Sequence, residues 1–268
     1  MNTTLKKVAA LAVAGASLTT FNANAEMFWS DNSITLLKNT SEFEINKNDD
    51  VAVVTLEHAS GHNWGDLFFF ADRLEFKEDS NYDEAKETYS ELSPRLSLSY
   101  ATGSKLQFGM ISDVFVATTW EHSSFTSPGF NQSFDNYLVG VGVDLKVSGF
   151  AFLNANVYQA NNELIDNDTQ LTVAWGYPFS VGNADFMFDG YIDWSSAEET
   201  HAADFHFNPQ LRMDIGKYFG APKKFEAGVE YSYWVNKFGA KVAWDQAVFA
   251  PVAVDDESVI SLIVKVHL

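Results

Sequence analysis

Residues Leu56–Asp72 read LEHASGHNWGDLFFFAD, and this stretch holds the pattern from which the fold of the whole chain can be argued. It predicts the end of one β-strand, a tight Gly/Asn turn and an aromatic strand. Side chains alternate between the two faces of a strand, so Asp66, Phe68, Phe70 and Asp72 share one face. Carboxylates and phenyl rings on one face do not suit a dry core. They suit the wall of a wet channel that handles flat molecules with polar edges.

The same alternation recurs along the chain in segments of about ten residues. In 225–232, four apolar side chains alternate with Glu226, Gly228, Glu230 and Ser232. Such segments, without long apolar runs, are typical of a transmembrane β-barrel. No run of about 18 apolar residues follows residue 25, so a helical membrane protein is not expected. The expected strands are 28–37, 51–60, 65–76, 88–100, 106–117, 134–147, 150–160, 169–179, 184–195, 204–218, 224–236 and 258–268.

The connections between these segments alternate in length. Short ones are expected at 61–64, 101–105, 148–149, 180–183 and 219–223, and longer polar ones at 38–50, 77–87, 118–133, 161–168, 196–203 and 237–257. Outer-membrane barrels have short periplasmic turns and longer outer loops. We therefore predict a twelve-stranded antiparallel transmembrane β-barrel of the bacterial outer membrane. A soluble β-sandwich also alternates, but the loop lengths and the aromatic residues near strand ends favour the barrel.

The composition limits the location and the partners of the protein. Residues 1–25 resemble a secretory signal peptide, because Lys6 and Lys7 precede an apolar run and Ala23-Asn24-Ala25 supplies a cleavage signal. Residues 26–268 are expected to form a single barrel domain. The chain has no cysteine, so packing or a closed hydrogen-bonded architecture must hold it together. The net charge of −19 argues against binding of nucleic acid.

Several motifs resemble the Tsx-like family of nucleoside-specific channels of the outer membrane. They are FW at 28–29, DLFFFAD at 66–72, ELSPRLS at 91–97, NVY at 156–158 and EYSYW at 230–234. The resemblance covers nearly the whole of residues 26–268 in order, whereas 58–63 matches no pattern of the family. It implies a twelve-stranded barrel with a narrow lumen that passes nucleosides. Some members serve as phage receptors, so a bacteriophage is a further candidate partner beside nucleosides and outer-membrane lipid.

The side chains on the polar face of the strands are the candidates for binding the solute. They are Glu57, Asp66, Phe68, Phe70, Asp72, Arg95, Asn156, Tyr158, Tyr191, Arg212 and Glu230. Their rings would stack on a base, at about 1–3 kcal/mol per base, and their polar groups would bind base edges and ribose. An acidic wall would repel phosphate and admit neutral nucleosides. Two alternatives stay open: both arginines are structural if they pair with lumen carboxylates, and Phe68 and Phe70 are a plug if the barrel is only an anchor.

The sequence predicts neither an enzyme nor a site for a metal or cofactor. His58 and Ser60 share one strand face, and some twelve-stranded barrels hydrolyse lipid with Ser and His on the lipid-facing side, but no Ser-His-Asn set stands out. His58 with His62, and His201 with His206, lack a third metal ligand. The expected function is a passive pore for nucleosides or similar small polar aromatic solutes. The alternative is a non-transporting barrel that acts as an adhesin, surface anchor or phage receptor through its loops.

Overall fold

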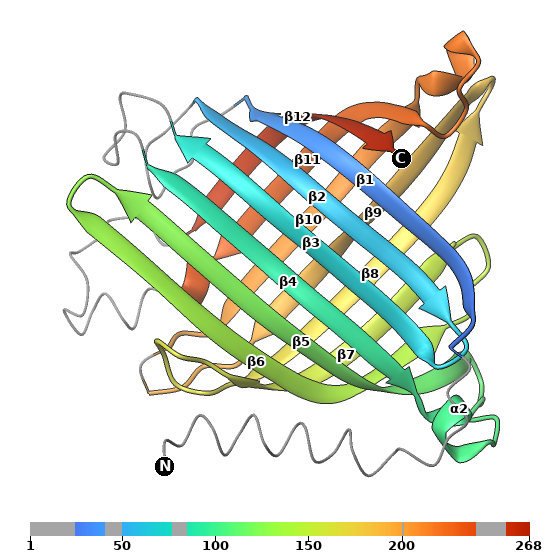
Figure 1. Cartoon of the computed structure of the whole chain (residues 1–268), viewed down its shortest axis with the longest axis horizontal. Coiled ribbons are helices and arrows are strands. Elements are labelled where there is room, and N and C mark those ends of the chain that lie inside the picture. Colours follow the sequence, from blue (N-terminus) through green and yellow to red (C-terminus); the bar gives the residue numbers. More distant parts are fainter. Residues whose placement is uncertain (1–24, 41–49, 77–84, 200, 240–255) are drawn as a thin grey trace.

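The computed structural model describes residues 25–40, 50–76, 85–199, 201–239 and 256–268. In this part the chain forms a closed antiparallel barrel of twelve strands, in which each strand pairs with its neighbours in sequence (Figure 1). The strands are β1 (Met27–Asn39), β2 (Val51–His62), β3 (Gly65–Phe76), β4 (Lys86–Ser97), β5 (Ile111–Ser127), β6 (Phe130–Leu145), β7 (Phe152–Asn161), β8 (Thr169–Val181), β9 (Ala184–Ser195), β10 (Asp204–Asp214), β11 (Phe225–Val235) and β12 (Glu257–His267). The predicted fold class is therefore confirmed. No described helix is long and apolar enough to cross a membrane.

The barrel closes where the first strand pairs with the last. The β1–β12 register runs from Ser33 opposite His267 to Asn39 opposite Ser261. Inside this seam, Lys265 Nζ lies 2.8 Å from Glu57 Oε1. In lipid each backbone polar group needs a partner within the protein, and closure leaves no open sheet edge to supply unpaired groups.

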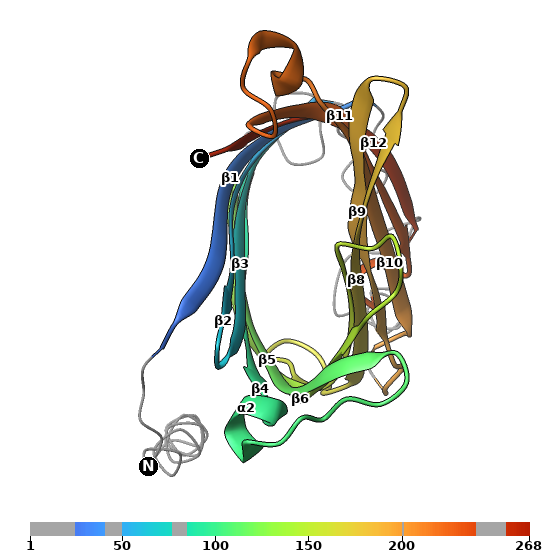
Figure 2. The ribbon, with the colours of Figure 1, turned by 90° about the vertical axis from the view of Figure 1, so that its right-hand side faces the viewer.

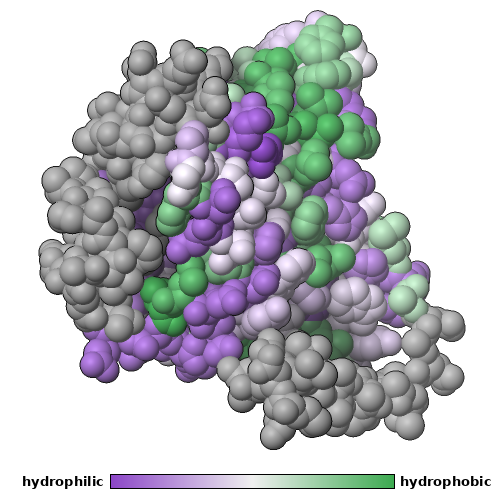
Figure 3. Space-filling model, turned by 60° about the vertical axis from the view of Figure 1, so that its left-hand side comes forward, coloured by the Kyte–Doolittle hydropathy of each residue, from purple (hydrophilic) through white to green (hydrophobic). Residues whose placement is uncertain are grey.

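The two faces of the barrel differ in the way that the alternation predicts. Arg95 of β4 donates from Nη1 to Asn156 Oδ1 of β7, at 3.3 Å. These strands are three places apart in the ring, so both side chains must point into the lumen. Side chains of the opposite parity face outward, and Leu36, Leu56 and Leu262 are 55%, 49% and 56% exposed. Figure 3 shows hydrophobic residues gathered on part of the outer wall.

The two ends of the barrel carry different connections. One end holds the β2–β3 turn, the short helix α2 (Leu98–Thr102), the 3₁₀ turn η1 (Gly216–Phe219) and the C-terminus, while the tip of the β5–β6 hairpin lies at the other end (Figure 1). Short connections mark the periplasmic end of an outer-membrane barrel. The two-residue β2–β3 and β8–β9 turns lie at the end with the C-terminus, and the longest connection, 236–256, lies at the other end, so the end with the C-terminus is the periplasmic one.

Helix α2 replaces the last residues of the fourth expected strand, 88–100. Ser97 ends β4 and caps the helix, because its Oγ accepts a hydrogen bond from the N–H of Tyr100 at 3.1 Å. Gly103 then ends the helix with φ 66°, a left-handed conformation that glycine adopts without strain. A Ser cap and a Gly stop therefore override the strand pattern.

The expected long loop 118–133 is instead the end of a long hairpin. β5 runs to Ser127, β6 begins at Phe130, and the turn between them holds Gly129 with φ 83°. The run 118–127 is rich in Ser and Thr, a composition that favours a loop over a strand. The Pro128-Gly129 pair was the overlooked signal, because such pairs mark tight turns.

The barrel is flattened in cross-section, with β1–β3 on one wall and β8–β10 on the other (Figure 2). At one bend between these walls, β6 has glycines on its inner face. A Cβ on Gly140 would lie 1.8 Å from the carbonyl oxygen of Val157 on β7. Close to this contact, Leu138 and Tyr158 form a buried cluster inside the barrel. Absence of a side chain at Gly140 therefore permits the close approach of β6 to β7.

We predict that Gly140→Ala lowers the free energy of unfolding by about 1–3 kcal/mol, because overpacking forces the backbone to shift. Urea unfolding in lipid, followed by tryptophan fluorescence, measures this change. Val141→Ala is the matched control, since Val141 is the next residue on the same strand and faces outward with 57% exposure. Equal stability of Gly140→Ala and wild type would show that the close approach imposes no constraint.

Candidate functional site

All eleven side chains predicted to line the lumen lie on the inner face of the barrel. The strand registers fix this, because Asp66 opposes Arg95, Glu57 opposes Phe70, and Gln210 opposes Glu230. The eleven form a central belt of aromatic and acidic groups, two arginine clusters near the periplasmic end, the ion pair of Glu57 with Lys265, and a buried tyrosine. In the described residues, no group of three or more His, Asp or Glu is arranged to hold a metal ion.

One wall of the central belt carries a ladder of three rings from β3 and β4. The centroids of Phe68 and Phe70 lie 5.9 Å apart, and those of Phe70 and Tyr89 lie 5.8 Å apart. Phe68 points inward yet is 38% exposed. Its ring is therefore open to the lumen and is not packed away as a plug would be.

The opposite wall carries a second group of rings, from β9, β10 and β11. His206 stacks on Trp234 with ring centroids 3.8 Å apart and an interplanar angle of 14°. Tyr191 meets His206 edge to face at 5.1 Å. The two groups face each other across the lumen, because β3 and β9 lie on opposite walls of the flattened barrel (Figure 2). The lumen thus has aromatic surface on both walls.

The carboxylates of the belt accept hydrogen bonds from uncharged donors. The pairs are Thr55–Asp72 (2.5 Å), Tyr89–Glu91 (2.8 Å), Asn136–Glu121 (2.9 Å), Thr172–Asp193 (2.5 Å) and Gln210–Glu230 (2.6 Å). Each of these contacts occupies one acceptor direction, whereas a carboxylate offers about four. The belt therefore keeps acceptor capacity for hydroxyl or N–H groups of a solute.

Arg95 lies nearer the periplasmic end and is fully engaged by the wall. Its Nε and Nη2 donate to the two carboxylate oxygens of Asp66 at 2.8 and 2.6 Å, and Nη2 also reaches Asp144 at 2.9 Å. The guanidinium carbon lies 4.4 Å from the ring centroid of Phe115. A forked pair of this kind is among the strongest hydrogen-bonded contacts in proteins, so these contacts favour the structural alternative for Arg95.

Arg212 makes a corresponding cluster on the other wall. Its Nη2 lies 2.7 Å from Asp189 and its Nε lies 2.6 Å from Glu226. Nη1 also donates to Gln210. The side chain of Arg212 is only 4% exposed. Both lumen arginines are thus held by carboxylates, and solute binding by either one stays a prediction.

Three other predicted residues lie outside the aromatic belt or are engaged within the wall. Asn156 belongs to the Arg95 cluster through its contact with Nη1. Glu57 is paired with Lys265 across the β1–β12 seam. Tyr158 is 4% exposed and packs in the cluster with Leu138, which leaves little of its ring for stacking on a solute.

The belt also contains residues that the sequence analysis did not select: Tyr89, Glu121, Asp193 and His206. Tyr89 shares the parity of Glu91, and His206 shares that of Arg212, so strict alternation would have found both. Glu121 was missed for a different reason, because it fell in the segment assigned to a loop.

The outer mouth holds a buried histidine in the loop before β10. His201 is 1% exposed, with Nε2 3.2 Å from Asp204 and Nδ1 3.1 Å from the carbonyl oxygen of Ser196. Burial opposes protonation, but the hydrogen bond and charge of Asp204 outweigh it and raise the pKa of His201 above its usual value. A Cβ on Gly239 would lie 1.8 Å from the His201 ring, so Gly239 packs against this histidine.

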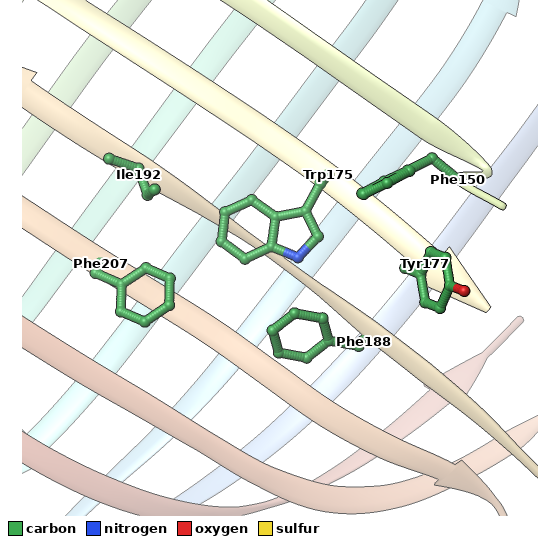
Figure 4. A pocket seen from close by; sticks show the side chains of 6 residues that line it. All are labelled: Phe150, Trp175, Tyr177, Phe188, Ile192 and Phe207. Carbon is green, nitrogen blue, oxygen red and sulfur yellow. The ribbon is translucent and has the colours of Figure 1, made fainter. Parts of the chain in front are cut away.

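An apolar groove of about 480 Å³ lies on the outer wall and not in the lumen. Its lining residues are Phe150, Trp175, Tyr177, Phe188, Ile192 and Phe207 (Figure 4). Trp175 stacks on Phe207 with ring centroids 5.9 Å apart. The lining residues on β8, β9 and β10 alternate with the inward-facing side chains and therefore point outward. The groove thus faces lipid and takes no part in the lumen site.

The closed barrel, its apolar outer face and its polar interior define an integral protein of the bacterial outer membrane. Residues 25–254 match the family model described as "Nucleoside-specific channel-forming protein, Tsx". The chain belongs to this family, as the sequence motifs predicted.

The chain is also similar to other known proteins. The chain is 29% identical over 137 residues to outer membrane protein OmpK of Vibrio parahaemolyticus serotype O3:K6 (strain RIMD 2210633), a match that covers 48% of this chain and 51% of that protein. The chain thus spans about half the length of the curated relatives it matches. Among solved structures, the KdgM porin aligns with a TM-score of 0.45 at 8% identity, covering 88% of this chain and 98% of that one. The NanC porin aligns with a TM-score of 0.46 at 9% identity, covering 88% and 100%.

We predict that Arg95→Met destabilises the barrel by about 1–3 kcal/mol, because it leaves the partly exposed carboxylates of Asp66 and Asp144 without their cation. Arg95→Met combined with Asp66→Asn should lose less than Arg95→Met alone, since one of the orphaned charges is removed. Urea unfolding of the three proteins in lipid measures the differences. An unaltered stability of Arg95→Met would contradict a structural role for the cluster.

Proposed function

We propose that the barrel is a channel for passive, selective diffusion of nucleosides or similar small polar aromatic solutes. The observation that carries the proposal is the pair of ring groups on opposite walls, with Phe68 and Phe70 on one and Tyr191 with His206 on the other. A nucleoside base has two apolar faces and polar edges. It could stack on either wall while its edges and ribose meet the carboxylates between them.

The charges of the lumen favour neutral solutes over phosphorylated ones. The carboxylates of the central belt are hydrogen-bonded to neutral donors, while Arg95 and Arg212 are held by Asp66, Asp189 and Glu226. A phosphate group would therefore meet an interior that is richer in carboxyl groups than in available cations. A neutral solute would find many weak contacts, and passage through a channel requires sites weak enough to release it.

Passage of this kind needs no catalytic step, cofactor or metal. We also propose that residues 1–25 are the export signal, as their composition predicts, and that 26–268 is the single barrel domain. Residues 1–24 lie outside the described part of the chain.

The alternative is a barrel whose function resides in its outer loops, as an anchor, adhesin or phage receptor. The long β5–β6 hairpin favours it to some extent, because its strands of 17 and 16 residues are the longest described. Outer-membrane strands need only about 9–11 residues to span the bilayer. The exposure of Phe68 to the lumen favours the channel.

We predict that Phe68→Ala combined with Phe70→Ala weakens the block of ion current by added nucleoside about tenfold or more, because stacking contributes about 1–3 kcal/mol per base. Conductance across planar lipid bilayers measures the block, and heat-modifiable gel mobility checks that the barrel is intact.

Phe69→Ala is the matched control, since Phe69 lies between the two on β3 and has the opposite, lipid-facing parity. It should leave the block unaltered. If nucleoside blocks the ion current of the double variant as strongly as that of wild type, the rings of Phe68 and Phe70 do not bind the solute. Absence of any conductance, together with unchanged nucleoside uptake in a deletion strain, would instead favour the anchor or receptor.

A further inference from the structure

A polar cluster occupies the outer face of β1 and β2, where the barrel meets lipid. His58 Nδ1 lies 2.8 Å from Asn32 Oδ1, and His58 Nε2 lies 3.0 Å from Ser60 Oγ. Asn32 faces His58 directly across the β1–β2 pair. All three residues have the same outward parity as Leu36 and Leu56, which are 55% and 49% exposed.

The position of the cluster matches the depth of lipid ester groups. Ser60 is three residues from the β2–β3 turn, which is about 8 Å along the axis of a barrel with tilted strands. The apolar residues Leu56 and Val54 follow on the same face toward the bilayer centre. Acyl esters of membrane lipids lie at the boundary between head groups and hydrocarbon. Ionisable groups placed against lipid are costly, and this cost makes such a cluster a candidate functional site.

The hydrogen bonds give each residue a defined chemical role. Asn32 Oδ1 can only accept, so it holds the proton of His58 on Nδ1. His58 Nε2 then carries a lone pair and accepts the proton of the Ser60 hydroxyl. In serine hydrolases of any fold, the nucleophilic serine is hydrogen-bonded to a base, and a third group orients that base. Ser60, His58 and Asn32 have this arrangement.

We propose that Ser60, His58 and Asn32 form a lipid-facing hydrolytic site for carboxylic esters of membrane lipids, an activity separate from passage through the lumen. It would revise the expectation of a protein without catalysis. The sequence showed His58 and Ser60 on one face, but it gave no sign that Asn32 of another strand completes the set.

The reaction balances with water as the only co-reactant. Ser60 Oγ bonds to the ester carbonyl carbon while its proton passes to His58 Nε2. The bond from this carbon to the alcohol oxygen breaks, and the leaving alcohol takes that proton. Water then gives a proton to His58 and its hydroxyl to the acyl carbon. The bond between Ser60 Oγ and the acyl carbon breaks, and Ser60 Oγ regains the proton from His58. The products are an alcohol and a carboxylic acid.

The site is closed in this structure. Ser60 is 1% exposed, and a second histidine lies on it, with His62 Nε2 3.0 Å from Ser60 Oγ. The His62 ring stacks on Trp64 with centroids 4.9 Å apart. An ester therefore reaches Ser60 only when the His62 ring turns aside, so removal of this ring should speed the reaction.

The test is covalent labelling of the full chain in detergent micelles by a fluorescent fluorophosphonate, which loses fluoride to a nucleophilic serine hydroxyl. Peptide mass mapping locates the adduct. We expect an adduct on Ser60, and we expect it to form faster in His62→Ala than in wild type. Ser60→Ala should abolish it, and His58→Ala should slow it by about 100-fold or more, as removal of a general base does.

Two further variants separate chemistry from structure. Ser30→Ala is the matched control, because Ser30 lies directly opposite Ser60 on the same outer face and should label like wild type. Asn32→Leu should lose labelling while Asn32→Asp, which keeps an acceptor oxygen, should retain it.

Heat-modifiable mobility confirms that each variant is folded. The proposal is overturned if neither wild type nor His62→Ala carries an adduct on Ser60, or if His58→Ala labels at the wild-type rate. Block of conductance by nucleoside, measured in Ser60→Ala, tests the proposed channel separately from the proposed hydrolytic site.

Discussion

The structure depends on the closed ring of backbone hydrogen bonds, completed where β1 pairs with β12. Lipid offers no partner to a backbone N–H or carbonyl group, so the sheet must close on itself. Closure then gives every strand one face toward lipid and one toward the interior. The alternation of polarity in the sequence is the consequence of this constraint, and it places rings, carboxylates and arginines together inside the barrel.

The interior divides into regions with different tasks because its charges are unevenly paired. Near the periplasmic end, Arg95 and Arg212 are neutralised by carboxylates and tie neighbouring strands together. In the central belt, carboxylates such as Asp72 and Glu91 are bonded to neutral donors and stand beside exposed rings. The first arrangement supports the wall, whereas the second leaves groups available to a passing solute.

Much of this arrangement follows from the sequence. Period-two alternation predicted the twelve strands and the inward direction of Asp66, Phe68 and Arg95, and family motifs predicted the relatives. Two kinds of feature could not be predicted from the sequence. Local caps and turns changed element bounds, as at Ser97 and Pro128-Gly129. Contacts between strands distant in sequence, such as Arg95 with Asn156, depend on the register and curvature of the closed sheet, which alternation does not encode.

The central claim is that the lumen selects neutral nucleosides, and single-channel recording in planar lipid bilayers tests it most directly. Ion current through the purified protein should fall as adenosine is added. Adenosine monophosphate at the same concentration should have little effect, because its phosphate meets the acidic lumen. An unchanged current with adenosine, or an equal block by the monophosphate, would contradict the account.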